Sequence, residues 1–247
     1  MDIGTAMKKK ENIMLINLEK LKYTGNGHSS LKKSIFYSTP ENCIIIDTGC
    51  NRGWWMQAMN AFIPDEIRGT VVKIGIDPIN YPDRQANGDY SYYFEEAIGL
   101  EDREEVSFYI VGTEPGCNSL LKPSEHLQNT TYQNQKRIVS EIIKVKQSRL
   151  DTILDNIEDK LDIYYAKFDL QGADLDGIKS LGKYLKKVEY LELELSLDEN
   201  MPFYENSSNM QEILDTLNNF GFEVIEFSSF PSSPLPEGEL LLRRKND

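Results

Sequence analysis

One junction constrains the fold of this chain more than any other feature: an apolar run that opens directly into a glycine turn. Residues 43–46 read Cys-Ile-Ile-Ile, with Pro40 before them and Asp47 and Gly49 soon after. A short run rich in β-branched residues, without polar alternation, is typical of a strand buried on both faces, as in a parallel sheet. Residues 54–62 then have helical spacing, so the junction predicts a strand, a tight turn and a helix in that order.

The same alternation continues along the chain without an internal repeat. Short apolar runs predict further strands at residues 70–76, 90–98, 106–111, 142–147, 163–168, 188–197, 222–227 and 239–243. Segments with helical spacing lie between some of them, at residues 150–157, 175–185 and 210–220. Strands that alternate with helices predict an α/β fold built on a doubly wound sheet.

The pattern predicts one domain rather than two. No linker-like segment divides residues 43–247, and residues 1–42 are expected to form an N-terminal extension with a helix at 11–23. Residues 112–137 are rich in Gly, Pro, Ser, Asn, Gln and Thr and show no clear period. We expect them to form a long loop insertion, which in compact domains is usually functional or mobile.

Composition excludes several classes of partner. The 247 residues carry 27 Lys and Arg against 40 Asp and Glu, and this net charge of −13 argues against a nucleic-acid backbone as ligand. Two His exclude Cys-His zinc patterns, and three widely spaced Cys indicate a reducing compartment. No apolar stretch approaches the roughly 18 residues of a membrane span. We expect a cytoplasmic protein without a membrane span.

The glycine turn itself limits the class of ligand that can bind there. Gly49 suits a tight turn and Gly53 lets the helix start lie close to the strand. Their G-x-x-x-G spacing is not that of a dinucleotide fold, and no G-K-[ST] follows as in a phosphate loop. Asp47 places a negative charge directly before the turn, where it disfavours a phosphate and favours a cationic or amino-bearing ligand.

A second acid follows the next predicted strand. Asp77 ends that strand, and Pro78 takes the chain out of it. An acidic side chain at this place accepts the hydroxyls of a ribose, although it is alternatively only the cap of a turn. Two acids at neighbouring strand ends suggest an adenosine ligand without phosphates. S-adenosylmethionine, with its ribose, amino group and sulfonium, fits this description.

These residues resemble a known family, the FkbM-type S-adenosylmethionine-dependent methyltransferases. The most specific piece is Lys-Phe-Asp-Leu-Gln-Gly-Ala-Asp at residues 167–174, which looks like the family's Lys-Ile-Asp-Val-Gln-Gly-Ala-Glu. Residues 46–53 resemble its Asp-x-Gly-x-Asn-x-Gly turn, and residues 76–78 resemble its acid–Pro pair. Further pieces match in the same order at residues 97–98, 118–120, 148–154, 193–196, 202–204 and 220–222.

The resemblance covers about residues 43–228 and carries definite implications. It implies a class I methyltransferase fold, which is Rossmann-like, with a seven-stranded, mostly parallel sheet whose last strand is antiparallel. It also implies S-adenosylmethionine as the cofactor and a hydroxyl oxygen of a sugar or natural-product scaffold as the methyl acceptor. Asp77 and Asp174 stand where the family more usually has Glu, so each carboxylate is one methylene shorter.

Binding residues follow from the same resemblance. We expect the cofactor to be bound by Asp47, Gly49, Cys50, Asn51, Gly53, Asp77, Pro78, Ala97, Ile98 and Asp169. Cys50 is expected to be a small packing residue of the turn rather than a nucleophile, since no His lies near it in the sequence. Asn118 and Ser119, at the edge of the insertion, are candidates for the acceptor site or are ordinary turn residues.

Three residues are candidates for catalysis. Asp169 is expected at the carboxyl end of a central strand, where it binds the acceptor hydroxyl, acts as the base or touches the cofactor. Glu194 lies in the next strand, and Lys167 shares a strand face with Asp169. Lys167 either pairs with Glu194 or forms a separate buried ion pair, whereas Glu189, Glu192 and Glu194 are alternatively a solvated face. No metal is predicted, because no dedicated ligand cluster accompanies Asp169 and Glu194.

The sequence therefore favours an S-adenosylmethionine-dependent O-methyltransferase that acts on a small-molecule or glycan acceptor. Two alternatives stay open. One is a non-catalytic domain that binds an S-adenosyl compound or a protein partner. The other is an RNA 2′-O-methyltransferase, which is chemically close but is disfavoured by the net charge of −13.

Overall fold

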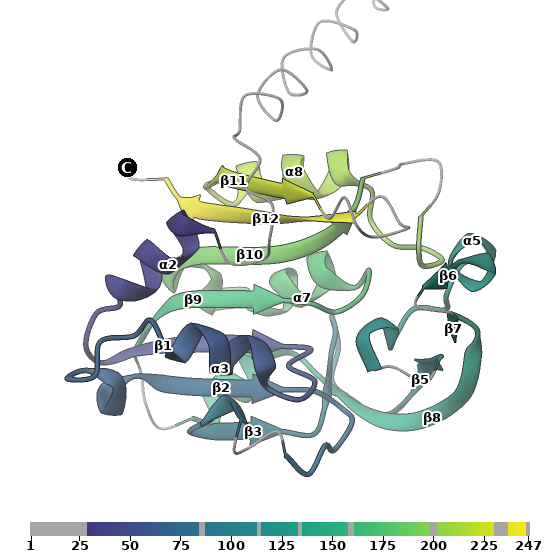
Figure 1. Cartoon of the computed structure of the whole chain (residues 1–247), viewed down its shortest axis with the longest axis horizontal. Helices are drawn as coiled ribbons and strands as arrows, with labels where there is room; N and C mark the ends of the chain where they lie inside the picture. The colour runs from purple at the N-terminus through teal and green to yellow at the C-terminus, as the bar shows by residue number, and fades with distance from the viewer. Residues whose placement is uncertain are drawn as a thin grey trace, which may run out of the picture.

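A seven-stranded sheet runs through the computed structural model, which describes residues 29–83, 87–112, 115–132, 135–157, 161–197, 202–229 and 237–245. Its strand order is β11-β12-β10-β9-β1-β2-β3, and β12 runs antiparallel to both of its neighbours. The strands are β1 (Cys43–Thr48), β2 (Val72–Ile76), β3 (Tyr92–Phe94), β9 (Asp162–Phe168), β10 (Val188–Ser196), β11 (Phe222–Ser229) and β12 (Glu237–Arg244). The predicted mostly parallel sheet with an antiparallel last strand is confirmed (Figure 1).

β1 lies at the centre of the sheet because its sequence has no face suited to water. All six of its residues are buried, and it is paired in parallel with β2 on one side and β9 on the other. Ile44 and Ile46 face one core, and Ile45 faces the opposite one. Full burial of such a side chain contributes roughly 1.5–3 kcal/mol relative to its exposure, so this run fixes the strand that carries the glycine turn.

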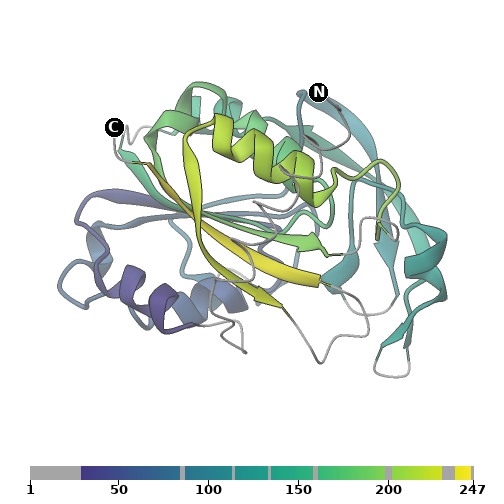
Figure 2. The same ribbon diagram turned by 90° about the horizontal axis from the view of Figure 1, so that it is seen from above.

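Helices cover both faces of the sheet, as Figure 2 shows. One face is covered by the two helices nearest the N-terminus of the described chain, α2 (Ser30–Tyr37) and α3 (Trp54–Asn60), around Phe36 and Tyr165. The other face is covered by three helices whose apolar residues pack on the sheet, α6 (Leu150–Asp155), α7 (Asp174–Ser180) and α8 (Met210–Asn219). Short 3-10 turns are η1 (Arg68–Thr70), η2 (Pro115–Cys117) and η3 (Gly182–Lys187).

A smaller sheet departs from the expected pattern. β4 (Ala97–Ile98), β5 (Arg103–Val111) and β8 (Val139–Ser148) form it in the order β4-β8-β5, so the run predicted as one strand at residues 90–98 divides between two sheets. Residues 112–137 were predicted to be a loop, but they contain η2, α5 (Glu125–Asn129) and a hairpin of β6 (Thr131–Tyr132) and β7 (Gln135–Lys136). These elements lie beyond the carboxyl ends of the main strands, on the same side as the smaller sheet (Figure 1).

The segment before β1 also packs on the main sheet. α2 begins at Ser29, whose hydroxyl accepts a hydrogen bond from the backbone N–H of Lys32 at 2.9 Å. Lys32 and Phe36 are buried, so part of the predicted N-terminal extension belongs to the core. The helix predicted at residues 11–23 lies outside the described residues. No helix among the described residues is long and apolar enough to cross a membrane.

Candidate active site

The turns that follow β1 and β9 are in direct contact at the carboxyl edge of the sheet. Gly49 has φ 67°, and its N–H donates to the carbonyl of Ile76 at the end of β2. The N–H of Asp169 donates to the carbonyl of Thr48 at 3.2 Å. A Cβ atom on Gly49 would lie 1.9 Å from the carbonyl oxygen of Asp169, so only glycine fits there. The predicted tight turn at Gly49 is therefore required by both its φ angle and its neighbour.

A cavity of about 610 Å³ opens between these turns and the smaller sheet. Eight of its lining residues were predicted from the sequence as site residues: Gly49, Asn51, Asp77, Pro78, Ala97, Ile98, Asn118 and Asp169. Eight others were not among the predicted site residues: Ile76, Glu96, Phe108, Gly116, Leu120, Leu170, Gln171 and Ala173. Most of these flank a predicted residue in sequence and could have been found by proximity, but nothing in the local sequence marks Phe108.

Asp77 forms the predicted cap of its turn and also borders the cavity. Its Oδ2 accepts a hydrogen bond from the N–H of Asn51 at 2.9 Å, and its Oδ1 accepts one from the N–H of Ile79 at 2.8 Å. Asp77 thus caps its own turn and ties it to the glycine turn, while it also lines the cavity. Each carboxylate oxygen has a second lone pair, so a ribose hydroxyl can still donate to it.

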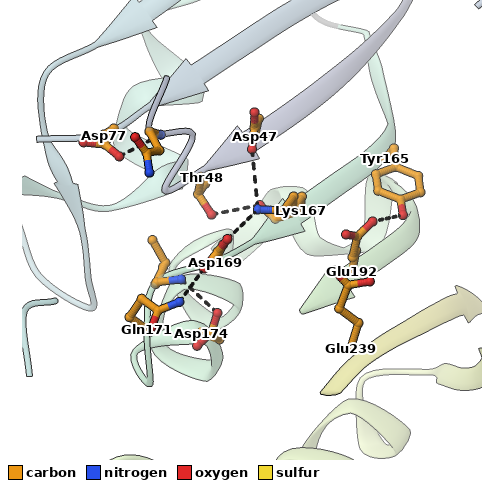
Figure 3. A network of polar contacts seen from close by, with 12 residues as sticks. Asp47, Thr48, Asp77, Tyr165, Lys167, Asp169, Gln171, Asp174, Glu192 and Glu239 are labelled. Atoms are coloured by element: carbon orange, nitrogen blue, oxygen red, sulfur yellow. Dashed lines mark hydrogen bonds and ion pairs between the residues drawn. The ribbon is translucent and has the colours of Figure 1, made fainter. Parts of the chain in front are cut away.

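The Asp169 carboxylate is held on both oxygens. Lys167 Nζ lies 2.9 Å from Oδ2, and Gln171 Nε2 donates to Oδ1 at 2.8 Å (Figure 3). The Asp169 side chain is 30% exposed, so this oriented carboxylate still faces the cavity. Burial alone would lower the pKa of Lys167, but the carboxylates of Asp169 and Asp47 raise it, so Lys167 is a cation at neutral pH.

Asp47 lies in a different environment from the one expected of a cofactor ligand. It is fully buried, and its Oδ2 accepts a hydrogen bond from the Tyr90 hydroxyl at 2.6 Å. Its Oδ1 lies 3.9 Å from Lys167 Nζ (Figure 3), and Asp47 is not among the described residues that line the cavity. Burial raises the pKa of Asp47 to about 6, against the influence of Lys167, which lowers it.

The acids of β10 divide between two environments. The backbone of Glu192 pairs with that of Lys167 across the sheet, and Glu192 is 1% exposed, so it is not part of a solvated face as one prediction had it. Its carboxylate contacts Lys32 Nζ at 3.0 Å and accepts a hydrogen bond from Tyr165. Among the described residues, Lys167 pairs with Asp169 and Asp47 and makes no ion pair with Glu194, so of its two predicted pairings the separate one is formed.

Glu194 lines a second cavity that borders the first. Burial, and next the nearby carboxylate of Asp169, raise the pKa of Glu194 well above its usual value. Asp174 lines the same cavity, and its two oxygens accept hydrogen bonds from the N–H groups of Leu170 and Gly172 at 3.0 Å each. Asp174 therefore braces the turn that carries Asp169. Within the described part of the chain, no group of three His, Cys, Asp or Glu residues is placed to hold a metal ion.

Three further predicted residues, Ser119, Cys50 and Gly53, support the turns and are not among the described residues that line the cavity. Ser119 is 1% exposed, and its hydroxyl donates to the carbonyl of Gln171 at 2.8 Å, which fastens the insertion to the Asp169 turn. Asn118 does line the cavity, and its Oδ1 accepts a hydrogen bond from the N–H of Val111 at 2.9 Å. Cys50 is buried in the core of the α2 and α3 face, and Gly53, at φ 74°, is the N-cap of α3.

The lining of the first cavity fits an adenosyl ligand. Asp77 supplies a carboxylate for ribose hydroxyls, and Ile98, Phe108 and Leu120 supply apolar surface for a base. Gly49 leaves the cavity floor without a side chain, and Asp169 supplies a second carboxylate at the far turn. These carboxylate acceptors and apolar surfaces match a nucleoside that carries a cationic group and no phosphate.

Comparisons with known proteins agree with this ligand class. The family model of the methyltransferase FkbM domain matches residues 47–224, more than half of the chain. No curated protein matches the sequence.

Several solved structures of methyltransferases are similar to this chain at low sequence identity. An rRNA methylase from Streptococcus thermophilus is 9% identical, with a TM-score of 0.43 over 90% of this chain and 99% of that one. The 1,6-didemethyltoxoflavin-N1-methyltransferase of Burkholderia thailandensis, with bound S-adenosylhomocysteine, is 10% identical, with a TM-score of 0.42 over 90% and 80%. A magnesium protoporphyrin IX methyltransferase from Synechocystis, with bound S-adenosylmethionine, is 11% identical, with a TM-score of 0.41 over 87% and 77%.

Proposed function

Because this chain belongs to the FkbM methyltransferase domain family and is an S-adenosylmethionine-dependent methyltransferase, we propose that it methylates a hydroxyl oxygen. The acceptor is a sugar, a glycan or a natural-product-like small molecule. The protein works in the cytoplasm and does not act on nucleic acid, in keeping with its net charge of −13. When bound, S-adenosylmethionine supplies an electrophilic methyl group on a sulfonium.

The observation that carries this proposal is the fixed carboxylate of Asp169. A hydroxyl is a weak nucleophile, so methylation of its oxygen needs a group that accepts the hydroxyl proton. Asp169 faces the cavity with both oxygens held, one by Lys167 and the other by Gln171. In this proposal an oxygen of Asp169 binds and orients the acceptor hydroxyl and then accepts its proton.

The two other candidate residues take supporting roles in this proposal. Lys167 fixes the rotamer of Asp169, because the charged ammonium lies 2.9 Å from the carboxylate. Glu194 lies nearby on β10 and lines the neighbouring cavity, where it contacts the acceptor.

The proposed cofactor contacts belong to two groups. Asp77, Pro78, Asn51, Ala97 and Ile98 line the cavity and contact the cofactor directly, as do Gly49 and Asp169. Asp47, Cys50 and Gly53 act indirectly, since their positions shape the turn that carries Gly49 and Asn51.

The test uses full-length protein, S-adenosylmethionine with a labelled methyl group, and a panel of sugars, glycans and polyhydroxylated natural products. We expect transfer to oxygen, and we expect Asp169→Asn to lower the rate by about 100- to 10,000-fold, the usual worth of a general base. S-adenosylhomocysteine binding, measured by calorimetry, is the control that the variant is folded. Label found on nitrogen or carbon, or a variant as active as the wild type, would contradict the proposal.

A further inference from the structure

A second cavity, of about 440 Å³, borders the cofactor cavity at the turn that carries Asp169. Its walls come from four places: the turn at residues 171–174, the carboxyl end of β10, the segment at residues 203–208 and Ile213 of α8. The last three of these walls take no part in the first cavity. The second cavity therefore has its own lining and a single shared wall.

That shared wall is Gln171, which lines both cavities. Its Nε2 donates to Asp169 Oδ1 at 2.8 Å, and its Oε1 accepts a hydrogen bond from the Tyr204 hydroxyl at 2.8 Å. Gly172 follows with φ 93°, and a Cβ atom there would come within 3.0 Å of the Tyr204 side chain. The Gln171 amide thus lies between the proposed base and Tyr204, so the second cavity adjoins the Asp169 carboxylate across one side chain.

The lining of the second cavity is rich in oxygen. Hydroxyl groups come from Ser196, Ser207, Ser208 and Tyr204, and a carboxylate comes from Glu194. None of the described residues that line it is Lys or Arg. Hydroxyl and carboxylate oxygens accept hydrogen bonds from the hydroxyls of a ligand, so the lining suits a polyol.

The same lining is unsuited to an anion. Burial raises the pKa of Asp174 to about 7, against the two backbone N–H groups that lower it, and the pKa of Glu194 is also raised. Burial is the first cause of both shifts, so this lining disfavours a negative charge. A phosphate or carboxylate of a ligand would be buried there as a charge, and no cation stands in the described lining to offset that cost.

We propose that the second cavity is the acceptor pocket and that it takes a sugar-like polyol without phosphate or carboxylate. This rests on the proposed function, because it assumes that a hydroxyl is methylated at Asp169. The apolar side chains of Phe203 and Ile213, which also line the pocket, provide surface for the C–H faces of such a ring.

Ligand-observed NMR on the full-length protein saturated with S-adenosylhomocysteine tests this directly. The probes are methyl glycosides of common hexoses, together with glucose 6-phosphate and glucuronic acid as anionic counterparts. We expect binding of at least one methyl glycoside, and binding at least tenfold weaker for both anions. Equal binding of the anions, or no binding of any methyl glycoside, would overturn the proposal.

Variants test whether the methyl glycosides bind in the second cavity. Ser208→Trp fills the cavity and is expected to weaken glycoside binding at least tenfold, whereas Lys144→Trp, at an exposed position of β8, leaves it unchanged. Retained S-adenosylhomocysteine affinity shows that each variant is folded. Ser208→Lys places a cation in the lining and is expected to reduce the discrimination against glucose 6-phosphate at least threefold, so it serves if Ser208→Trp does not fold. Unchanged glycoside binding in Ser208→Trp, or unchanged discrimination in Ser208→Lys, would overturn the assignment.

The outcomes separate this proposal from the proposed function. If product is formed on oxygen at the wild-type rate in folded Ser208→Trp, the methylation chemistry stands and the pocket assignment fails. If glycosides bind in the cavity but labelled methyl groups appear on nitrogen, the pocket stands and the O-methylation proposal fails.

Discussion

Two pairs of carboxylates on one sheet have opposite surroundings. Asp77 and Asp169 lie at the ends of strands, are held by backbone, amide or ammonium groups, and border the cofactor cavity. Asp47 and Glu192 are at most 1% exposed, lie outside that cavity and contact buried tyrosines and lysines. Carboxylates thus line the cavity at the edge of the sheet, whereas one or two residues deeper they belong to the internal structure.

Lys167 connects the two pairs. Its Nζ lies 2.9 Å from Asp169 at the edge and 3.9 Å from Asp47 in the interior, and its strand position pairs with that of Glu192. A buried cation among acids is a common way to fix a unique arrangement, but its removal leaves uncompensated charge. The comparison therefore predicts that the interior acids govern stability and the edge acids govern binding.

The largest effect is expected when the shared cation is removed. Lys167→Met leaves Asp47 without its neighbouring cation, and the expected loss in the free energy of unfolding is about 3–5 kcal/mol. Urea denaturation measures it, and Lys183→Met, at an exposed position, is the control with an expected change within about 0.5 kcal/mol. A loss below about 1 kcal/mol in Lys167→Met would show that the interior pair does not depend on this lysine.

A pH series sharpens the interior side of the comparison. The pKa of Asp47 is raised by burial from 3.8 to about 6, so the folded state binds this proton more tightly than the unfolded state. The stability that this carboxyl contributes is therefore fully present below about pH 4 and is lost as the pH rises to about 6. Across this window the free energy of unfolding of the wild type should fall by up to about 3 kcal/mol relative to that of Asp47→Asn. No further fall is expected from pH 7 to 8.

Urea denaturation of both proteins at each pH gives this difference directly. Tyr90→Phe, which removes the hydroxyl donor and keeps the carboxyl, is a useful companion variant because it should retain the pH dependence. A wild type that gains stability relative to Asp47→Asn as the pH rises, or a difference between the two that does not change with pH, would contradict the assignment.

The edge side of the comparison is tested by cofactor affinity. Asp77→Ala removes a carboxylate from the cavity and is expected to weaken S-adenosylmethionine binding about 10- to 100-fold, since a hydrogen bond to a charged group contributes about 1.5–3 kcal/mol. Asp169→Ala is expected to weaken it far less, because that residue acts mainly on the acceptor. Calorimetry measures the affinity of both variants for S-adenosylmethionine, and equal losses of affinity would contradict this division of roles.

The smallest effect concerns the wall of the cavity. Ser119→Ala removes the hydroxyl that donates to the Gln171 carbonyl and accepts from the Leu121 N–H. The expected loss in stability is about 1 kcal/mol, the usual contribution of a buried hydrogen bond, with a change in cofactor affinity below about threefold. Thermal unfolding and calorimetry measure the two quantities. If the variant lost more free energy of cofactor binding than free energy of unfolding, Ser119 would belong to the cofactor-binding site.

The sequence was most informative where the site is local. Gly49, Asn51 and Asp77 were predicted from a strand, a turn and the next strand, and the structure places all three around one cavity. The main sheet was predicted for the same reason, because each of its strands is a separate short apolar run. Such features depend on neighbouring residues alone.

Features that depend on distant pairing could not be predicted in this way. Phe108 reaches the cavity only because β5 pairs with β8 in a second sheet, which no local pattern indicates. Glu192 was grouped with solvated residues because Glu alternates with Leu there, but Lys32, from a helix before the first strand, neutralises it. Asp47 follows an apolar run, and only the packing of Tyr90 and Lys167 shows that its side chain is enclosed.

The missing side chain of Gly49 has a consequence for redesign of the enzyme. The Asp169 carbonyl occupies the place of a Cβ atom, so the turns after β1 and β9 cannot be separated or enlarged independently. A variant meant to accept cofactor analogues with bulkier transferable groups must therefore gain its space on the opposite wall. Phe108 and Leu120 line that wall from outside the main sheet, and trimming them leaves the paired turns intact.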